Sequence, residues 1–399
     1  MTEILLTIFF ISVLLIFLGS GIWVAISMVG VSSIGMMLFT TRPVGDAMAT
    51  TIWGASSSWT LTALPLFVWM GEILFRTKLS ENLFEGLSPW MQKLPGGLVH
   101  VNVVGCALFA AISGSSAATV ATVGKMSIPE LRKRKYPESI LLGSLAGSGT
   151  LGLLIPPSII LIIYGVTVQE SIAKLFIAGI LPGIMIALIF MTYVMIWSSI
   201  NKKSMPTFKQ DFSFIEKVRK SGKLIPVILL IVSVIGSIYT GIATATEAAS
   251  LGVVGALILS YFQKSLSLKT FKESLLGATK TSCMIAFILA GATFLSLAMG
   301  FTGLPRNLAL WIEGMELSPY VLIFVLMIFY IILGMFLDGI SAVVLTMAII
   351  EPMIRQAGFD MIWFGVFLVI VVEMAQITPP VGFNLFVLQG MANKDMGYI

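Results

Sequence analysis

The chain has 399 residues, of which 57% are hydrophobic and only 11% are charged, with a formal net charge of +5. Soluble domains carry about 25% charged residues, so this composition excludes an ordinary soluble protein and predicts a polytopic membrane protein. The single histidine excludes a histidine-based metal centre. No basic face with interleaved aromatic residues occurs, which argues against nucleic-acid binding.

Apolar runs and clusters of lysine and arginine predict the topology of the first half. The positive-inside rule places the basic clusters in the cytoplasm and the N-terminus outside. The expected elements of a first repeat, residues 1–198, are scaffold helices within 1–60 (near 4–19 and 21–40), a helix near 60–76, an amphipathic surface stretch Ser80–Lys93, a re-entrant hairpin at 97–129, a broken helix at 138–165 and an intact helix at 171–198. These elements cross the membrane an odd number of times, so a second copy must be inverted.

The second half repeats the same order of elements. A basic cytoplasmic linker at 199–223 leads into an inverted repeat at 224–399. Its expected elements are helices near 224–241, 245–263 and 281–300, a surface stretch Leu304–Glu316, a hairpin at 319–354 and a broken helix at 362–390. No counterpart of 171–198 follows before Ile399, so we expect this sequence to lack the final helix. The predicted fold class is therefore an all-α membrane protein with two inverted repeats.

Both halves contain a small-residue break followed by a Pro-Pro pair. The first half has Ser113-Gly-Ser-Ser-Ala-Ala-Thr119 and Ile155-Pro156-Pro157-Ser158. The second has Leu337-Asp-Gly-Ile-Ser341 and Thr378-Pro379-Pro380-Val381. Interrupted helices at bilayer depth are tolerated where they line a cavity, and a corresponding pair of them indicates the binding site of a secondary transporter.

Backbone carbonyls and hydroxyls at these breaks suit two or more Na⁺ ions. The candidate ligands are Ser113, Gly114, Ser116, Gly152, Ile155, Asp338, Gly339, Ser341 and Thr378. A carboxylate within a membrane segment costs about 2.5–3.5 kcal/mol, so Asp338 should be compensated, and a bound ion would do this. Two alternatives remain open: Asp338 could simply cap a helix from Gly339 onward, and the first break could be a tight turn packed by small residues.

The same breaks offer helix N-termini and hydroxyls to a carboxylate substrate. The candidate contacts are Ser115, Ser116, Ser158, Thr378, Asn384 and Arg306. The prolines should free the carbonyls of Gly152–Ile155 and Ala375–Thr378, although a kink without a ligand role is also possible. Three charged residues have open roles. Glu247 either caps a helix or lines the site, Glu373 either tunes the site or pairs with a neighbouring helix, and Arg306 meets either substrate or lipid.

With these motifs, the chain resembles the large membrane subunit of TRAP (tripartite ATP-independent periplasmic) transporters over essentially its whole length. The matching motifs are Tyr239-Thr-Gly-Ile-Ala-Thr-Ala-Thr-Glu-Ala-Ala249, Leu333-Gly-Met-Phe-Leu-Asp338 and Gln376-Ile-Thr-Pro-Pro-Val-Gly-Phe-Asn-Leu-Phe386. Family sequences usually read Thr-Pro-Thr-Glu where this chain has Thr244-Ala-Thr-Glu247, and they normally carry one more apolar helix.

The resemblance implies Na⁺-driven import of a small organic acid across the bacterial inner membrane. It also implies a periplasmic substrate-binding protein, a separate small membrane subunit and an elevator mechanism. The alternatives are a stand-alone Na⁺-coupled carrier of the same hairpin class and an ion channel. A membrane enzyme is disfavoured because one histidine cannot supply a Ser/His/Asp set.

Overall fold

The computed structural model describes residues 3–77, 79–206, 212–305, 307, 310, 314, 318–379 and 382–399. Within these ranges the chain forms α-helices and short 3-10 turns, and no strand. The elements of the first half are α1 (Glu3–Gly19), α2 (Val24–Phe39), α3 (Val44–Ser56), η1 (Trp59–Thr62), α4 (Ala63–Phe75), α5 (Leu79–Met91), α6 (Val99–Ser113), α7 (Ser116–Lys133), α8 (Glu138–Gly149), α9 (Leu151–Leu154), α10 (Ile159–Thr167) and α11 (Ile172–Ile200). Those of the second half are η2 (Lys202–Ser204), α12 (Phe214–Ser221), α13 (Ile225–Tyr239), α14 (Ala245–Phe262), α15 (Leu268–Phe301), α17 (Pro319–Gly334), α18 (Gly339–Gln356), α19 (Met361–Ala375) and α20 (Phe383–Ala392).

Most expected helices occur within a few residues of their predicted bounds, but α3, α12 and the start of α15 differ from the prediction. Helix α3 was not predicted, because its Thr, Ser and Gly residues break the apolar run that the prediction relied on. Helix α12 was not predicted either; it lies inside the basic linker and starts with a capping box at Ser213 and Glu216. The predicted surface stretch Leu304–Glu316 lies mostly outside the described residues.

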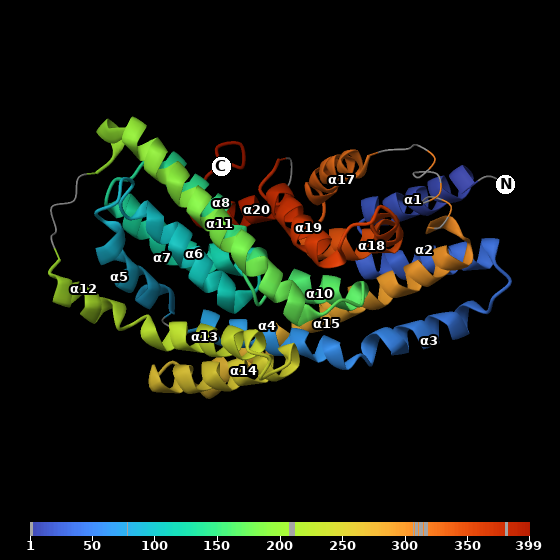
Figure 1. Ribbon diagram of the computed structural model, residues 1–399, viewed down its shortest axis with the longest axis horizontal. Helices are drawn as coiled ribbons and strands as arrows, with labels where there is room; N and C mark the ends of the chain where they lie inside the picture. The colour runs from blue at the N-terminus through green and yellow to red at the C-terminus, as the bar shows by residue number, and fades with distance from the viewer. Residues whose placement is uncertain are drawn as a thin grey trace.

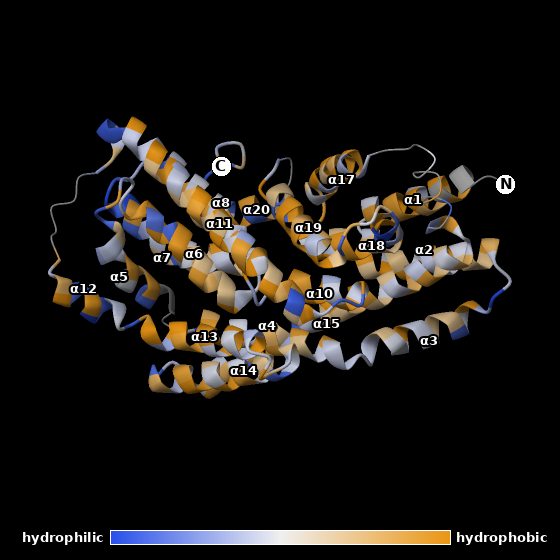
Figure 2. Ribbon diagram, in the orientation of Figure 1, coloured by the Kyte–Doolittle hydropathy of each residue, from blue (hydrophilic) through white to orange (hydrophobic). Residues whose placement is uncertain are grey.

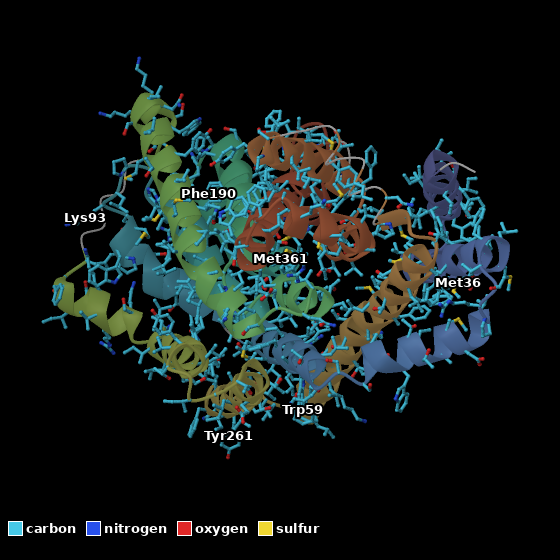
Figure 3. All side chains as sticks on the ribbon, turned by 45° about the vertical axis from the view of Figure 1, so that its right-hand side comes forward. Met36, Trp59, Lys93, Phe190, Tyr261 and Met361 are labelled. Carbon is cyan, nitrogen blue, oxygen red and sulfur yellow. The ribbon has the colours of Figure 1, made fainter. Side chains whose placement is uncertain are left out.

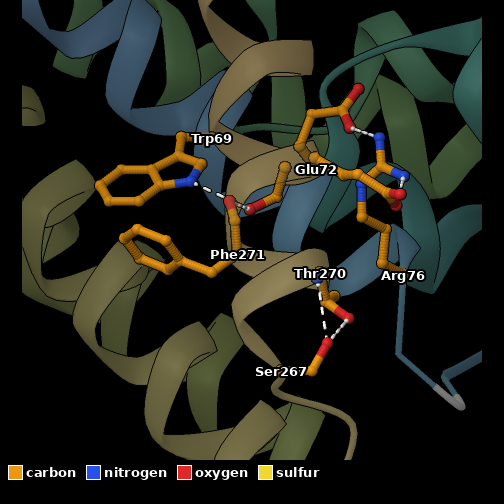
Figure 4. Close-up of polar contacts among 8 residues, drawn as sticks. Trp69, Glu72, Arg76, Ser267, Thr270 and Phe271 are labelled. Carbon is orange, nitrogen blue, oxygen red and sulfur yellow. Dashed lines mark hydrogen bonds and ion pairs between the residues drawn. The ribbon is translucent and has the colours of Figure 1, made fainter.

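Helix α15 begins at Leu268, well before the predicted start at residue 281. The side chain of Ser267 caps it by accepting a hydrogen bond from the Thr270 amide at 3.0 Å. The added polar turns are held by α4, as Figure 4 shows: the Trp69 indole donates to Ser274 at 3.3 Å, and Arg76 pairs with Glu273 at 3.3 Å. The predicted start relied on apolar residues alone, and the residues before 281 are mostly polar. The prediction therefore left out the first turns of α15.

The helices pack as two groups (Figure 1). Helix α15 packs along α2, α3 and α4, and α14 packs against α4 and α13. The second group contains the antiparallel pair α6 and α7, the interrupted helices α8–α10 and α19–α20, and the helices α17 and α18. Long helix α11 runs across the second group in Figure 1 and contacts both α10 and α19.

The outer surface is apolar over most of its helices. Figure 2 shows hydrophobic residues along α11, α13, α17 and α19, and more hydrophilic ones near α5, α7 and α12. Leu181 on α11 and Tyr261 on α14 are large side chains that are 75% and 69% exposed, and Tyr261 projects from the periphery in Figure 3. Among the described residues, four helices are long and apolar enough to cross a membrane, and three bent helix pairs pass the same test. Lipid is the natural solvent for such a surface.

The two interrupted helices are joined directly through Tyr164. This residue of α10 is fully buried, and its hydroxyl donates to the Met361 carbonyl on α19 at 2.7 Å. Gly365 lies under its ring, since a Cβ at that position would be 2.5 Å from Cε1 of Tyr164. Met361 lies near the middle of the molecule in Figure 3, so this contact is part of the core.

We expect Tyr164→Phe to lower stability by roughly 0.6–1.5 kcal/mol, because the Met361 carbonyl would lose a buried hydrogen bond. Thermal melting of the detergent-purified protein measures this change. The matched control is Tyr193→Phe on α11, whose side chain is 59% exposed. Equal melting temperatures for the two variants would contradict the prediction.

Candidate functional site

The first hairpin turns within two residues, Gly114 and Ser115. Gly114 ends α6 in the left-handed region with φ +58°, a conformation that favours glycine. Ser115 then caps α7, its hydroxyl accepting from the Ala118 amide at 3.5 Å. The hydroxyl of Ser113 lies 2.9 Å from that of Thr119, which closes the tip from inside. The turn therefore lies within the segment Ser113–Ala117 that was predicted to form the hairpin tip.

This tip docks against the first helix break. The Ile159 amide donates to the Gly114 carbonyl at 3.3 Å, and a Cβ on Gly114 would be 2.7 Å from the Pro157 carbonyl oxygen. Gly152 lies closer still, since a Cβ there would be 2.5 Å from the Cα of Ser116. The structure thus brings the candidate residues of the first tip and the first break into backbone contact.

Within the first break, Ile155 is extended, the Pro156–Pro157 peptide bond is cis, and Ser158 caps α10. The carbonyls of Gly152, Leu154 and Ile155 accept no hydrogen bond from any described residue, as predicted. The expectation was wrong for Leu153, whose carbonyl accepts the Ser158 hydroxyl. A local side chain has replaced the amide that proline removed.

The second hairpin turns just before α18, and Asp338 caps that helix. Its Oδ2 accepts from the Ser341 amide at 3.1 Å, so the capping alternative is observed in this structure. Ion binding by Asp338 stays a prediction, and capping does not compete with it because a carboxylate has several acceptor positions. Ser341 is 1% exposed and its hydroxyl has no partner among the described residues.

The last turn of α19 lies between the two hairpin tips. On one side, a Cβ on Gly339 would be 2.7 Å from Cγ1 of Val372 and 2.5 Å from Nε2 of Gln376. On the other, the Ser116 hydroxyl donates to Oε1 of Glu373 at 2.9 Å. We call this region the tip junction: the tips Ser113–Ser116 and Asp338–Ser341 with the α19 turn 372–376. It joins both halves of the chain.

The second break is less open than predicted. The Ala375 carbonyl accepts from the Thr378 amide at 3.0 Å, and that of Gln376 accepts from the Asn384 amide at 3.2 Å, so these two carbonyls are not free. The Thr378 hydroxyl donates to the Met374 carbonyl at 2.7 Å. Pro379 is exposed, whereas Pro380 lies outside the described residues. Asn384 is fully buried, and neither atom of its amide has a described partner.

Two candidates are not brought to the tip junction. Glu247 is exposed and forms a capping box with Thr244, so of its two alternative roles the structure shows the cap. Arg306 lies outside the described residues. Conversely, Glu373 was not among the candidate ligands, although it is 3% exposed and in contact with the first tip. An acidic residue five positions before Thr378 in an apolar run was the available signal.

A cleft of about 660 Å³ lies between the two helix groups. It is bounded by the η1 region, the C-terminal end of α10, the middle of α15 and residues 344–352 of α18. Polar side chains including Thr60, Thr293, Ser296 and Glu351 line it. None of the candidate ion or substrate residues lines it, so this cleft is distinct from the tip junction.

An all-helical bundle with a lipid-compatible surface, two helical hairpins and two interrupted helices meeting in its interior has the architecture of a membrane transporter. The sequence comparison is specific: residues 10–399 match the family model described as the tripartite ATP-independent periplasmic transporter, DctM component. The chain belongs to this family and is therefore a TRAP transporter large permease subunit, not an enzyme.

Curated relatives agree with this assignment. The chain is 32% identical over 364 residues to the C4-dicarboxylate TRAP transporter large permease protein DctM of Pseudomonas aeruginosa, covering 91% of this chain and 84% of the relative. It is 32% identical to the 2,3-diketo-L-gulonate TRAP transporter large permease protein YiaN of Escherichia coli, covering 86% and 81%. It is also 32% identical to the isethionate TRAP transporter permease protein DctMQ of Oleidesulfovibrio alaskensis, covering 96% of this chain and 60% of the relative.

A solved structure shares the fold. The YdaH transporter of Alcanivorax borkumensis superposes with a TM-score of 0.66 at 13% sequence identity, covering 96% of this chain and 92% of that one. At this identity the likeness supports the arrangement of helices alone.

Proposed function

We propose that this chain imports a small organic acid by Na⁺-coupled secondary transport, with the tip junction as its binding centre. The observation that carries the proposal is the meeting of both hairpin tips at the last turn of α19. In a transporter, such a meeting of interrupted segments supplies helix ends and free carbonyls at bilayer depth. A cation at the free carbonyls and an anion at the helix N-termini can then be bound close together.

The ion-binding part of the site is supported by oxygen atoms without partners. The carbonyls of Gly152, Leu154 and Ile155 and the hydroxyl of Ser341 accept no hydrogen bond from described residues. Hard monovalent and divalent cations prefer such oxygen ligands. Asp338 contributes a carboxylate at the second tip, so we assign one Na⁺ to each tip.

The substrate part is supported by the N-terminal ends of α7 and α18. Both helices begin at the tip junction, with Ser115 and Asp338 as their caps. Helix N-termini attract anions through their unpaired amides and the helix dipole. The named relatives transport C4-dicarboxylate, 2,3-diketo-L-gulonate and isethionate, which are all small organic anions. We therefore propose a carboxylate or sulfonate of similar size as the substrate.

Membership of this family supports two protein partners. We propose that a periplasmic binding protein delivers the substrate and that a small membrane subunit completes the complex in the inner membrane. The basic segments around Arg132–Lys135 and Lys202–Lys223 lie in the cytoplasm, with the N-terminus outside. In an elevator mechanism, the hairpins and interrupted helices would move as one unit against α1–α4 and α13–α15.

Uptake into proteoliposomes tests the proposal. The complex of this chain with its small subunit is supplied with a panel of organic acids, with and without the binding protein and an inward Na⁺ gradient. We expect uptake to require both. Uptake with Na⁺ alone would identify a stand-alone carrier, and currents far above carrier rates would identify a channel.

A further inference from the structure

Glu373 is the most deeply buried carboxyl group among the described residues, at 3% exposure. Its Oε1 accepts the Ser116 hydroxyl at 2.9 Å, and its Oε2 has no partner. The residue lies in the last turn of α19, where this helix meets the first hairpin. One hydrogen bond does not compensate a carboxylate that has been removed from water.

No side chain in the described part of the chain forms an ion pair with Glu373 that would supply the missing positive charge. None of the ion pairs formed by the described residues includes Glu373. On the helices packed against α19, Tyr330 bonds to Thr346, Tyr164 donates to Met361, and Arg355 pairs with Glu351. The hydroxyl of Ser341 on α18 has no described partner, but it carries no charge. A lone carboxylate inside a membrane protein costs several kcal/mol, so the group is neutralised either by a proton or by a bound cation.

Asn384 provides a second group without a partner in the same region. Glu373 contacts Ser116 at the start of α7, and Met391 lies against Gly124 further along the same helix. A Cβ on Gly124 would be 2.9 Å from Cε of Met391. Helices α7 and α20 therefore run side by side in the same direction. Asn384 lies seven residues before Met391, which places it level with the first turn of α7. Its amide is fully buried and has no described partner.

We propose that Glu373 is a direct ligand of a transported alkali cation at the junction of the first hairpin with α19. Oε2 of Glu373 and the hydroxyl of Ser116 supply oxygen ligands, and the Asn384 amide supports the same pocket. The cation neutralises the carboxylate in place of a proton, and it links a residue of the second half to the tip of the first. This inference rests on the proposed transport function, to which it adds one ligand and one link between the halves.

The test measures Na⁺ binding by the purified protein through its melting temperature. Melting in NaCl is compared with melting in choline chloride at the same ionic strength. Wild-type protein should gain stability with Na⁺ and not with choline, because a ligand bound only by the folded state raises the melting temperature. Glu373→Gln keeps the shape and the acceptor for Ser116 but removes the charge. We expect it to need at least ~10-fold more Na⁺ for the same shift, or to show a smaller maximal shift.

In choline alone, Glu373→Gln should melt no lower than wild type, since a neutral amide of the same shape replaces a buried carboxyl group that has no bound cation. A purely structural role for Glu373 predicts the opposite. The matched control is Glu130→Gln on α7, a partly exposed carboxylate paired with Arg134. Its Na⁺ response should equal that of wild type. Ser116→Ala, which keeps the carboxylate, should weaken the Na⁺ response less than Glu373→Gln does.

The outcomes separate this inference from the function on which it rests. If Na⁺ stabilises wild type and Glu373→Gln with the same concentration dependence, Glu373 is not an ion ligand, while Na⁺ coupling stands. If wild type shows no Na⁺-specific shift, both ideas fail. Should Glu373→Gln not be recovered in folded form, an unchanged Na⁺ response of Ser116→Ala would also overturn the inference.

Discussion

Gly152→Ala should reduce substrate uptake at least ~10-fold while the protein remains folded. The added methyl group would be 2.5 Å from the Cα of Ser116 and 2.6 Å from the Ser115 carbonyl oxygen. Both neighbours are backbone atoms, which cannot rotate away as a side chain would. The first break must then separate from the first tip, and the carbonyls of the two segments no longer face a common ion.

The control for this variant is Gly143→Ala on α8. A Cβ there meets nothing within 4 Å, so the substitution adds a methyl group at an open position. It should leave uptake unchanged and stabilise the helix slightly, by about 0.5–1 kcal/mol. The measurement is initial uptake rate in proteoliposomes with equal amounts of protein. Equal rates for the two variants would show that close contact between break and tip is not required.

Asp338→Asn should raise the Na⁺ concentration for half-maximal uptake by at least ~10-fold, which corresponds to about 1.4 kcal/mol of lost ion binding. The substitution separates the two roles considered for this residue. Asn caps a helix as well as Asp does, so the start of α18 should stay intact. The negative charge, in contrast, is removed from the second tip. Uptake measured over a series of Na⁺ concentrations gives the shift.

Asp360→Asn is the matched control. Asp360 caps α19 in the same way, its Oδ1 accepting from the Trp363 amide at 2.8 Å, but it is exposed and is not part of the tip junction. The two variants should have similar melting temperatures, and only Asp338→Asn should change the Na⁺ dependence. If both leave the Na⁺ dependence at the wild-type value, Asp338 acts as a cap alone.

The hairpins and breaks could be predicted from the sequence because their causes are local. Gly114 alone permits the left-handed turn after α6, and the pair at 156–157 cannot continue a helix. The positions of Ser115 and Asp338 as caps follow from the same short-range rules. Their residue types therefore specify the two turns and the first break without reference to the rest of the chain.

Other features depended on contacts that a local pattern does not contain. The hydrogen bond between Ser116 and Glu373 spans 257 positions, so neither neighbourhood indicates it. The polar start of α15 is stabilised by Trp69 and Arg76 of α4, not by its own hydropathy. The carbonyl of Leu153 was predicted to be free, but the hydroxyl of Ser158 reaches it. Side chains near a break can thus donate hydrogen bonds to carbonyls that have no backbone donor.

A Na⁺ gradient is proposed to drive substrate import through this chain. The most direct measurement is the ratio of internal to external substrate in proteoliposomes holding the complete transporter and its binding protein, with the Na⁺ gradient directed inward, absent or outward. We expect accumulation above the external concentration only with the inward gradient, and loss of that accumulation when the gradient is removed. The same ratio under all three conditions would contradict Na⁺-coupled import.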